Sequence, residues 1–254
     1  MSALNALDWI EDHERELHAA LAALRCESGT VARWGRTLAE RLLDGGRLLA
    51  AGNGGSAAEA QHLTSELVGR FLEERRPFSA ISLCAESSSV TAIVNDYGAD
   101  EMFARQVEGH GRPGDVLVLL STSGKSPNVV RAAERGREMG MHVWAMTGRG
   151  PNPLAERSDD ALCVDAPSTA AIQAVHLVAI HALCAVLDVE LANLAAGAAL
   201  ATGGNLTPGA NLSDGPNLAG ATLAARPAPG AHALPGAPHA SPLGTTRDPL
   251  RRSA

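Results

Sequence analysis

The chain has 254 residues, of which 45% are hydrophobic and 19% are charged, and its formal net charge is −7 at pH 7. This length and composition are typical of one well-buried domain with an appendage. The acidic balance provides no basic footprint of the kind that DNA and RNA binding require, which argues against nucleic acid as a direct partner.

The N-terminal region lacks the features of a targeting segment. It carries acidic residues such as Asp8 and Glu11 rather than a basic stretch followed by an apolar one, and no run approaches the length of a membrane span. The cysteines are scattered without a close pair, which argues against a zinc ribbon or a disulfide framework. They are Cys26, Cys84, Cys163 and Cys184. A reducing cytoplasm is therefore the expected compartment, with no membrane partner.

Two amphipathic helices are predicted before the first strand. Apolar residues between Leu4 and Leu24 recur at three- and four-residue steps, and a second helical pattern runs from Gly29 to Leu43. Because no strand separates them, these helices should form an N-terminal layer. It packs on the main domain or on a neighbouring subunit, and subunit contact is the preferred use.

Five short apolar runs then alternate with helical patterns. This order predicts an α/β fold with a doubly wound, five-stranded, mainly parallel sheet flanked by helices. The expected strands are Arg47–Ala51, Ala80–Leu83, Val116–Leu120, His142–Met146 and Ala161–Val164. Ligands of such sheets sit beyond the carboxyl ends of the strands, so the loops after the first and third strands should face the same rim.

The first of these loops combines a glycine turn with two ionisable side chains. Gly52-Asn53-Gly54-Gly55-Ser56 follows the first strand and opens a helix that carries His62 and Glu66, four residues apart on one face. Glycines let the backbone approach a ligand closely, and the helix N-terminus favours anionic or polyhydroxyl groups. A plain packing turn is the alternative. A dinucleotide site is disfavoured because no acid ends a second strand about 20 residues on.

The second loop is rich in hydroxyl groups. Ser121-Thr122-Ser123-Gly124-Lys125-Ser126 follows the third strand, and Ser126 is the expected N-cap of a helix starting near Pro127. Clustered hydroxyls at a helix N-terminus hold a phosphate without much cationic charge. A P-loop is rejected because Leu119 stands where its first glycine is required. A phosphorylated small molecule is the favoured ligand, and an ordinary capped turn is the alternative.

A last helix is expected from Thr169 to Val189, with Gln173, His176 and His181 on it. From residue 190 onward the chain has no aromatic residue, isoleucine or valine, so residues 1–188 are predicted to form the domain and 189–254 a disordered, low-complexity tail. A hexapeptide leucine repeat leaves a β-helix as the alternative for this tail. Its leucines are Leu194, Leu200, Leu206, Leu212 and Leu218.

These motifs resemble those of the phosphoheptose isomerases, also called sedoheptulose 7-phosphate isomerases, within the sugar isomerase (SIS) superfamily. The similarity runs from roughly residue 1 to 188. The segments that carry it are Ala51–Phe71 (AGNGGSAAEAQHLTSELVGRF), Ala92–Gly98 (AIVNDYG), Ser121–Asn128 (STSGKSPN), Met146–Gly148 (MTG) and Ile172–His181 (IQAVHLVAIH). No counterpart is identified for the tail.

The resemblance implies an aldose–ketose isomerase that acts through an enediol, with Glu66 as base and His181 as acid. The implied substrate is D-sedoheptulose 7-phosphate and the implied product D-glycero-D-manno-heptose 7-phosphate. The resemblance also implies a set of substrate-binding residues. These are Asn53, Gly54, Gly55, Ser56, Glu66, Arg70, Asn95, Asp96, Ser121, Thr122, Ser123, Ser126 and Gln173.

Some relatives hold zinc, and the resemblance implies one ion per subunit on four ligands and no nucleotide cofactor. The matching ligands here are His62, Glu66, Gln173 and His181. A homotetramer is implied as well, with Arg70 and the N-terminal helical layer near subunit boundaries.

The chain departs from many relatives beside Gln173. Those relatives carry an acidic residue and an arginine just before the glutamine and a glutamate just after it, whereas residues 168–174 read STAAIQA here. This departure leaves the sugar preference open, so an isomerase or lyase of another phosphosugar is one alternative. A second alternative is a non-catalytic SIS protein that binds a partner such as a replication initiator.

Overall fold

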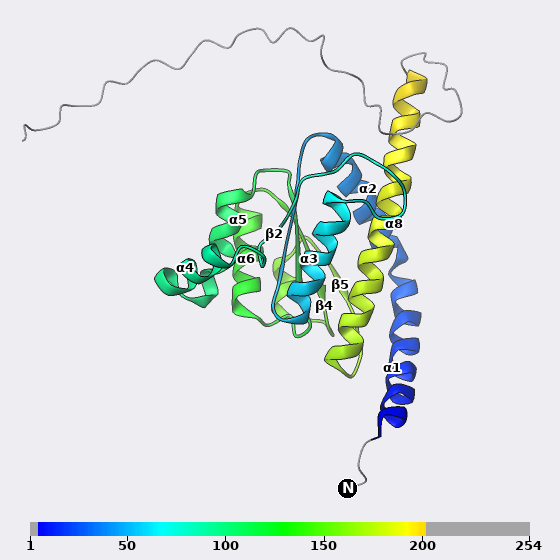
Figure 1. The fold of residues 1–254 in the computed structure, drawn as a ribbon, viewed down its shortest axis with the longest axis vertical. Coiled ribbons are helices and arrows are strands. Elements are labelled where there is room, and N and C mark those ends of the chain that lie inside the picture. The colour runs from blue at the N-terminus through cyan, green and yellow to red at the C-terminus, as the bar shows by residue number, and fades with distance from the viewer. Residues whose placement is uncertain (1–4, 202–254) are drawn as a thin grey trace, which may run out of the picture. The chain divides into compact units, whose positions relative to one another are not determined.

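The computed structural model describes residues 5–201, and residues 1–4 and 202–254 lie outside the described part. Helices and strands alternate after an initial helical pair (Figure 1). The elements are α1 (Ala6–Cys26), α2 (Ser28–Leu43), β1 (Leu48–Gly52), α3 (Gly55–Val68), β2 (Ala80–Ser82), α4 (Ser87–Tyr97), η1 (Ala99–Glu101), α5 (Ala104–His110), β3 (Val116–Ser121), α6 (Pro127–Glu138), β4 (His142–Thr147), α7 (Pro153–Arg157), β5 (Asp160–Cys163) and α8 (Thr169–Ala201).

The strands form one sheet in the order β2-β1-β3-β4-β5, and every neighbouring pair is parallel. The predicted doubly wound parallel sheet is confirmed, and each strand end lies within one residue of its expected position. Continuous apolar runs identified these strands because both faces of a parallel sheet are covered, so neither face needs polar side chains.

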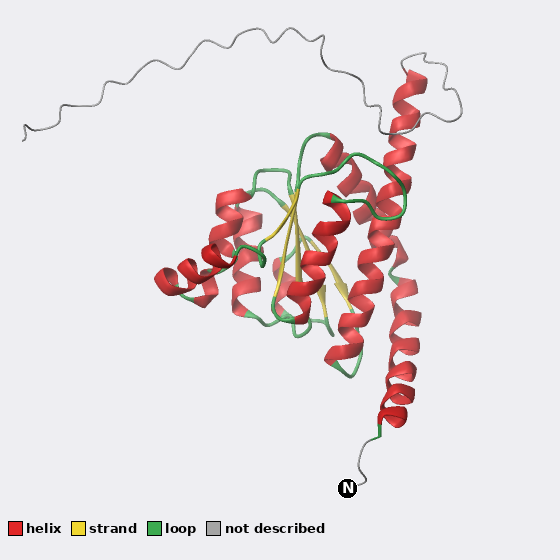
Figure 2. Ribbon diagram, viewed as in Figure 1, coloured by secondary structure: helices red, strands yellow, loops and turns green. Residues whose placement is uncertain are grey.

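Side chains alternate between two cores, one on each face of the sheet. Leu48 and Ala50 of β1 join Trp144 and Met146 of β4 in a core that also holds residues of α2, α3 and α8. The next residues along each strand, such as Leu49, face a second core made with α5, α6 and α7. Helices therefore cover both faces, as the ribbon shows (Figure 2).

The N-terminal layer packs mainly on α8. Trp34 of α2 stacks on Trp144 of β4 with ring centroids 4.9 Å apart, and its indole N–H donates to Asp160 at 2.9 Å. The second half of α1 packs near the start of α8 through Ala20, whereas Trp9 near its beginning is 47% exposed. The predicted helical layer is thus present, and part of its apolar surface is uncovered.

Two expectations about the C-terminal region need correction. The last helix does not end near Val189 but continues to Ala201, so part of the predicted disordered tail is helical. Residues 190–201 include many alanines and leucines, which favour helix without needing a core. The rest of the tail, with Leu206, Leu212 and Leu218 of the repeat, lies outside the described residues.

The expectation that no apolar run approaches a membrane span is also wrong by length and composition. Within the described residues, Thr169–Ala198 of α8 is long and apolar enough to pass that test. Half of its most apolar window is buried inside the protein, and the core helix of a soluble protein passes the same test.

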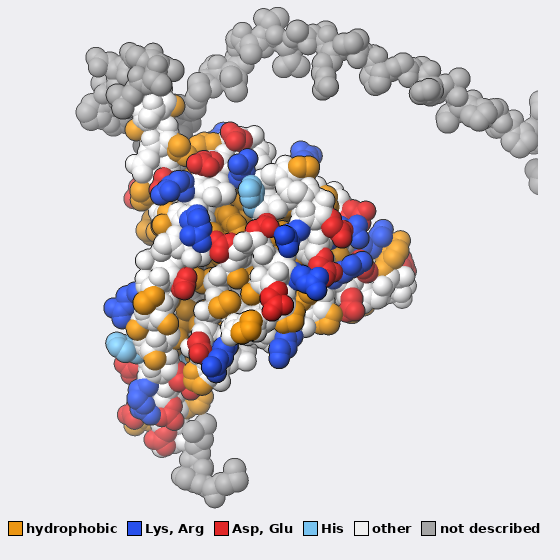
Figure 3. Space-filling model, turned by 180° about the vertical axis from the view of Figure 1, so that it is seen from behind, with side chains coloured by type: hydrophobic (Ala, Val, Ile, Leu, Met, Phe, Trp, Pro, Cys, Tyr) orange, Lys and Arg blue, Asp and Glu red, His pale blue; other side chains and the backbone are white. Residues whose placement is uncertain are grey.

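Acidic and basic side chains are interspersed on the face of the molecule that Figure 3 shows, and no continuous basic stripe crosses that face.

A glycine sets the distance between α2 and α8. A Cβ atom at Gly35 would lie 2.4 Å from Cγ1 and 2.8 Å from Cβ of Val186, which is far inside van der Waals contact. Val186 is β-branched and has little rotamer freedom in a helix, so it does not move aside easily. Gly29, also on α2, has no atom within 4 Å of such a position.

Substituting Gly35→Ala should therefore lower the free energy of unfolding by about 1–3 kcal/mol through overpacking. Gly29→Ala is the matched control, and it should stabilise the protein slightly because alanine restricts the unfolded chain. Urea unfolding of both variants measures the difference. Equal stabilities for the two variants would contradict the close packing of α2 on α8.

Candidate functional site

The glycine turn is shaped by a left-handed residue and a close helix contact. Gly54 has φ 57° and ψ −122°, a conformation that side chains disfavour. A Cβ atom at Gly55 would lie 2.4 Å from the side-chain nitrogen of Gln173 on α8. The turn thus places the side-chain amide of Gln173 against the N-terminus of α3, and a larger residue at position 55 would require that amide to move.

The hydroxyl-rich loop forms a compact turn ahead of α6. Ser121 and Ser126 approach one another with their hydroxyl oxygens 3.2 Å apart, and the Ser123 hydroxyl accepts from the amide of Lys125. Ser126 occupies the N-cap position as predicted, but its side chain makes no cap hydrogen bond. In the first turn of α6, Pro127 has no N–H and the amides of Val129 and Val130 donate to the carbonyl of Ser126, so the amide of Asn128 is the backbone donor left for an anion.

The two loops are joined to each other at the carboxyl edge of the sheet. The side-chain amides of Asn53 and Asn128 donate to one another reciprocally, each at 3.0 Å. Asn128 lies in the first turn of α6, so this pair links the glycine turn with the hydroxyl-rich loop. Asn128 was not among the predicted site residues, because an amide in a loop motif has no sequence signal for its partner.

Three predicted residues converge between α3 and α8. The Nε2 atoms of His62 and His181 are 2.9 Å apart, and Nε2 of His62 is 3.3 Å from Oε1 of Glu66. Phe71 stacks on the ring of His181 with centroids 5.7 Å apart. Both helices begin at the rim where the loops lie, and the cluster lies about two to three turns along them from that rim.

The cluster has the donor set of a metal site. One ligand atom from each of His62, Glu66 and His181 lies within 4.8 Å of the others. Two imidazole nitrogens and a carboxylate oxygen suit zinc, whose catalytic sites keep three protein ligands and an open position. Gln173, the fourth predicted ligand, lies about 12 Å before His181 along α8 and packs against Gly55 in this conformer. The structure therefore assembles three of the four ligands.

Three other predicted substrate residues form hydrogen bonds with partners outside this cluster. Arg70 follows α3, is exposed, and donates to the carbonyl of Leu72. Asn95 and Asp96 are exposed on α4, and the amide of Asn95 donates to the Asp96 carboxylate at 2.8 Å. Within residues 5–201, the side-chain hydrogen bonds of Arg70, Asn95 and Asp96 do not reach the glycine turn or the hydroxyl-rich loop.

A buried acid and a buried imidazole lie beside the predicted site. His176 is fully buried, and its Nε2 is 3.1 Å from the carbonyl oxygen of Thr147, so Nε2 carries the proton. Its Nδ1 lies 3.9 Å from Oε2 of Glu59 on α3, and neither atom has a hydrogen-bond partner. Burial raises the pKa of Glu59 to about 7 and lowers the pKa of His176 to about 4. Both groups are therefore largely neutral near pH 6.

Sequence reasoning missed Glu59, and it placed His176 on the last helix without including it in the site. A glutamate on a helix usually faces solvent, and only the tertiary fold turns this one inward. The one feature of the sequence that could have indicated a role for Glu59 is its position three residues before His62.

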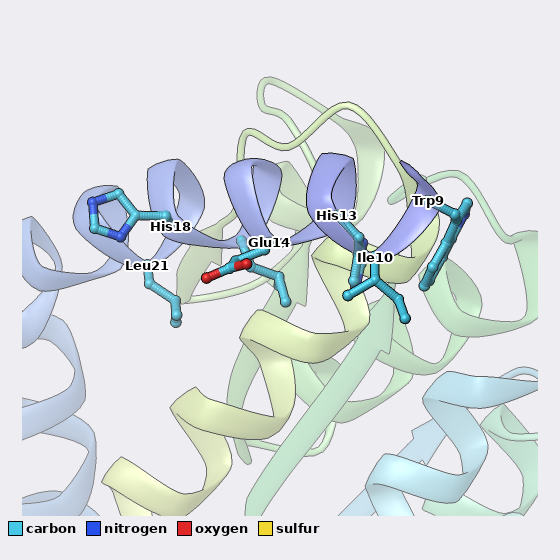
Figure 4. A pocket seen from close by; sticks show the side chains of 7 residues that line it. Trp9, Ile10, His13, Glu14, His18 and Leu21 are labelled. Atoms are coloured by element: carbon cyan, nitrogen blue, oxygen red, sulfur yellow. The ribbon is translucent and has the colours of Figure 1, made fainter. Parts of the chain in front are cut away.

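A separate groove runs along the uncovered part of α1. It has a volume of about 430 Å³ and is lined by α1 alone, with Trp9, Ile10 and Leu21 on one side of the helix (Figure 4). None of its lining residues belongs to the predicted site. It marks a surface available for contact with another chain.

Comparison with known proteins points to one family. A family model described as the SIS domain matches residues 12–148. The phosphoheptose isomerase of Streptomyces coelicolor is 60% identical over 186 residues, which span 73% of this chain and 80% of that protein. That of Thiobacillus denitrificans is 48% identical over 179 residues, spanning 69% of this chain and 88% of the relative.

Solved structures show the same likeness. The phosphoheptose isomerase of Neisseria gonorrhoeae superposes with a TM-score of 0.67 and 38% identity, covering 72% of this chain and 99% of that one. The Francisella tularensis protein gives a TM-score of 0.66 and 32% identity, with 73% and 99% covered. More than a quarter of this chain therefore has no counterpart in those structures.

The Glu59–His176 pair predicts an unusual dependence of stability on pH. A carboxyl group whose pKa rises from 4.5 to about 7 on folding makes the folded state less favourable as pH rises through that window. An imidazole whose pKa falls from 6.5 to about 4 has the opposite effect. The two contributions offset each other between pH 4.5 and 6.5.

Glu59→Gln removes only the first contribution. Its free energy of unfolding should therefore gain relative to the native chain as pH rises from about 5 to about 7.5. Urea unfolding at both pH values measures this gain. Glu40→Gln, which changes an exposed glutamate, serves as control and should show a constant difference. A constant difference for Glu59→Gln as well would show that burial does not perturb Glu59.

Proposed function

We propose, because the chain belongs to the phosphoheptose isomerase family of SIS-domain proteins, that it converts D-sedoheptulose 7-phosphate into D-glycero-D-manno-heptose 7-phosphate. Membership of this family makes the chain an enzyme of the isomerase class. The observation that carries the proposed reaction is the convergence of Glu66 and His181, a carboxylate and an imidazole, in one cluster.

The substrate phosphate is assigned to the hydroxyl-rich loop. Ser121, Thr122, Ser123 and Ser126 supply hydroxyl donors there, and the uncapped start of α6 adds the backbone N–H of Asn128. This binding mode needs little cationic charge, which suits an acidic protein. The sugar hydroxyls are assigned to Asn53, Ser56 and Gln173 at the glycine turn, with Asn95, Asp96 and Arg70 as further contacts implied by the family.

The reaction moves one proton between adjacent carbons and another between adjacent oxygens. In the proposed mechanism Glu66 removes a proton from C1 of the ketose while His181 protonates the oxygen on C2, which gives an enediol. Glu66 then returns its proton to C2, and His181 takes the proton from the C1 hydroxyl, which leaves the aldehyde. No redox cofactor is consumed, and the charge that develops on oxygen is stabilised by the imidazole.

Zinc is part of the proposal as one ion per subunit. His62, Glu66 and His181 would hold it, with Gln173 as fourth ligand after a change of side-chain conformation. When bound, zinc would supply Lewis-acid polarisation of a sugar oxygen. A carboxylate that binds metal is a weaker base, so the two roles of Glu66 compete.

A homotetramer in the cytoplasm is the proposed form of the enzyme. The uncovered groove on α1, with Trp9 and Ile10 exposed, supports subunit contact through the N-terminal layer. The four cysteines are all free, which suits a reducing compartment.

Replacing Glu66→Gln keeps the shape of the side chain and removes its basicity. The kcat for sedoheptulose 7-phosphate, followed as aldose formation by NMR, should fall by about 10²- to 10⁴-fold. Binding of the phosphosugar should persist because the hydroxyl-rich loop is untouched. Glu73→Gln, which changes an exposed glutamate after α3, is the control and should keep activity.

The same assay separates the rival functions. A native enzyme silent with sedoheptulose 7-phosphate but active on fructose 6-phosphate would favour another phosphosugar isomerase. A native chain silent with both sugars and unaffected by Glu66→Gln in every readout would favour a partner-binding SIS protein.

The metal proposal is tested by titrating the metal-free protein with Zn²⁺ in a calorimeter. His62→Asn should weaken zinc binding by more than tenfold, since even a supporting partner of a ligand is worth roughly 10- to 100-fold. His18→Asn, which removes an exposed histidine on α1, should leave the affinity unchanged. Equal affinity in both variants would remove His62 from the site.

A further inference from the structure

Arg75 is a buried cation that no proposed step uses. It follows α3 in the segment before β2, its side chain is only 5% exposed, and its Nε donates to Oδ1 of Asp188 on α8 at 2.9 Å. The Asp188 side chain is 8% exposed. Such a pair is costly to bury unless further hydrogen bonds satisfy its donors.

Two further donors of Arg75 bind the end of α3, and Nη1 also donates to the carbonyl of Arg76 at 3.3 Å. The Nη2 of Arg75 donates to the backbone carbonyl of Glu66 at 2.7 Å, and its Nη1 donates to the carbonyl of Leu67 at 3.1 Å. Carbonyls of the last helical turn have no partner within the helix, and a cation there also complements the helix dipole. Arg75 therefore caps the very turn that carries the proposed base.

Asp188 connects this cap to the proposed acid. It lies seven residues after His181, which is two turns further along the same face of α8. The guanidinium thus holds the backbone of Glu66 on one side and the helix of His181 on the other. Both contacts are fixed by the planar fork of one arginine.

Cys184 of α8 lies within range of the charges of these groups. Its thiol is buried, and the pKa is raised to about 12 by burial first and then by the charges of Glu66 and Asp188, while Arg75 acts in the opposite direction.

We propose that Arg75 and Asp188 are positioning residues that set the distance between Glu66 and His181 by clamping the last turn of α3 to α8. This role rests on the proposed function for its catalytic consequence. The clamp itself is a property of the fold and is measurable without any substrate.

Arg75→Lys tests the clamp, because lysine keeps the charge but lacks the fork. With sedoheptulose 7-phosphate, its kcat should fall by about 10- to 100-fold, as expected for a small misplacement of a catalytic group. Its KM should change little, because the phosphate loop is distant in sequence and unaltered. Arg76→Lys is the matched control. The guanidinium groups of both arginines lie over the ring of Phe78, that of Arg75 at 5.3 Å and that of Arg76 at 5.0 Å, but Arg76 is exposed.

Amide hydrogen exchange of the last turn of α3 gives a readout independent of activity. Exchange at residues 66–69 should be faster in Arg75→Lys than in the native chain, and unchanged in Arg76→Lys. Asp188→Asn should act like Arg75→Lys, and it replaces that variant if Arg75→Lys does not fold. Added guanidinium ion should restore part of the kcat of Arg75→Ala.

The outcomes separate the two proposals. A native enzyme that turns over the sugar while Arg75→Lys keeps its kcat overturns the positioning role, as does an equal loss in Arg76→Lys. A native chain without sedoheptulose 7-phosphate turnover overturns the proposed function, and hydrogen exchange then decides the clamp alone. Unchanged exchange in both Arg75→Lys and Asp188→Asn overturns the clamp.

Discussion

The parallel packing of α3 beside α8 is the constraint on which the candidate site depends. Both helices begin at the carboxyl edge of the sheet and cover the same face of it. Contacts cross between them at successive turns. From the rim inward these are Gly55 with Gln173, Glu59 with His176, His62 with His181, and the cap of Glu66 by Arg75 with Asp188. A shift of one helix along the other would misalign all of these contacts together.

In this arrangement the two ends of the site carry different chemical groups. The loops at the rim offer hydroxyl and amide groups without strong charge, and the reciprocal Asn53–Asn128 pair keeps them together. The other end holds the titratable groups His62, Glu66 and His181, all of them partly buried. A phosphorylated polyol fits such a division, because its charged end needs donors and its reacting end needs groups that exchange protons.

The sequence predicted the elements well where a local pattern determines them. Buried parallel strands appear in the sequence as continuous apolar runs. His62 and Glu66 are four residues apart, so they lie on one face of a helix in any fold. Arg75, Glu59 and Asn128 could not be predicted in this way. Charged and amide side chains usually face solvent, and only contacts between distant segments determine that these do not. The extension of α8 was missed because the alanine-rich composition was judged by its poor burial rather than by its helix propensity.

The stacked tryptophans give this fold an optical signature of its own. The chain has three tryptophans. Trp34 and Trp144 form a nearly parallel pair at 4.9 Å inside the core, whereas Trp9 stands on the uncovered side of α1. Two indoles at that distance couple their electronic transitions, and this coupling is lost when the α2–sheet contact opens. Emission from Trp9, in contrast, reports on the polarity at the uncovered side of α1, so the core and this surface are followed by two separate signals from the unlabelled chain.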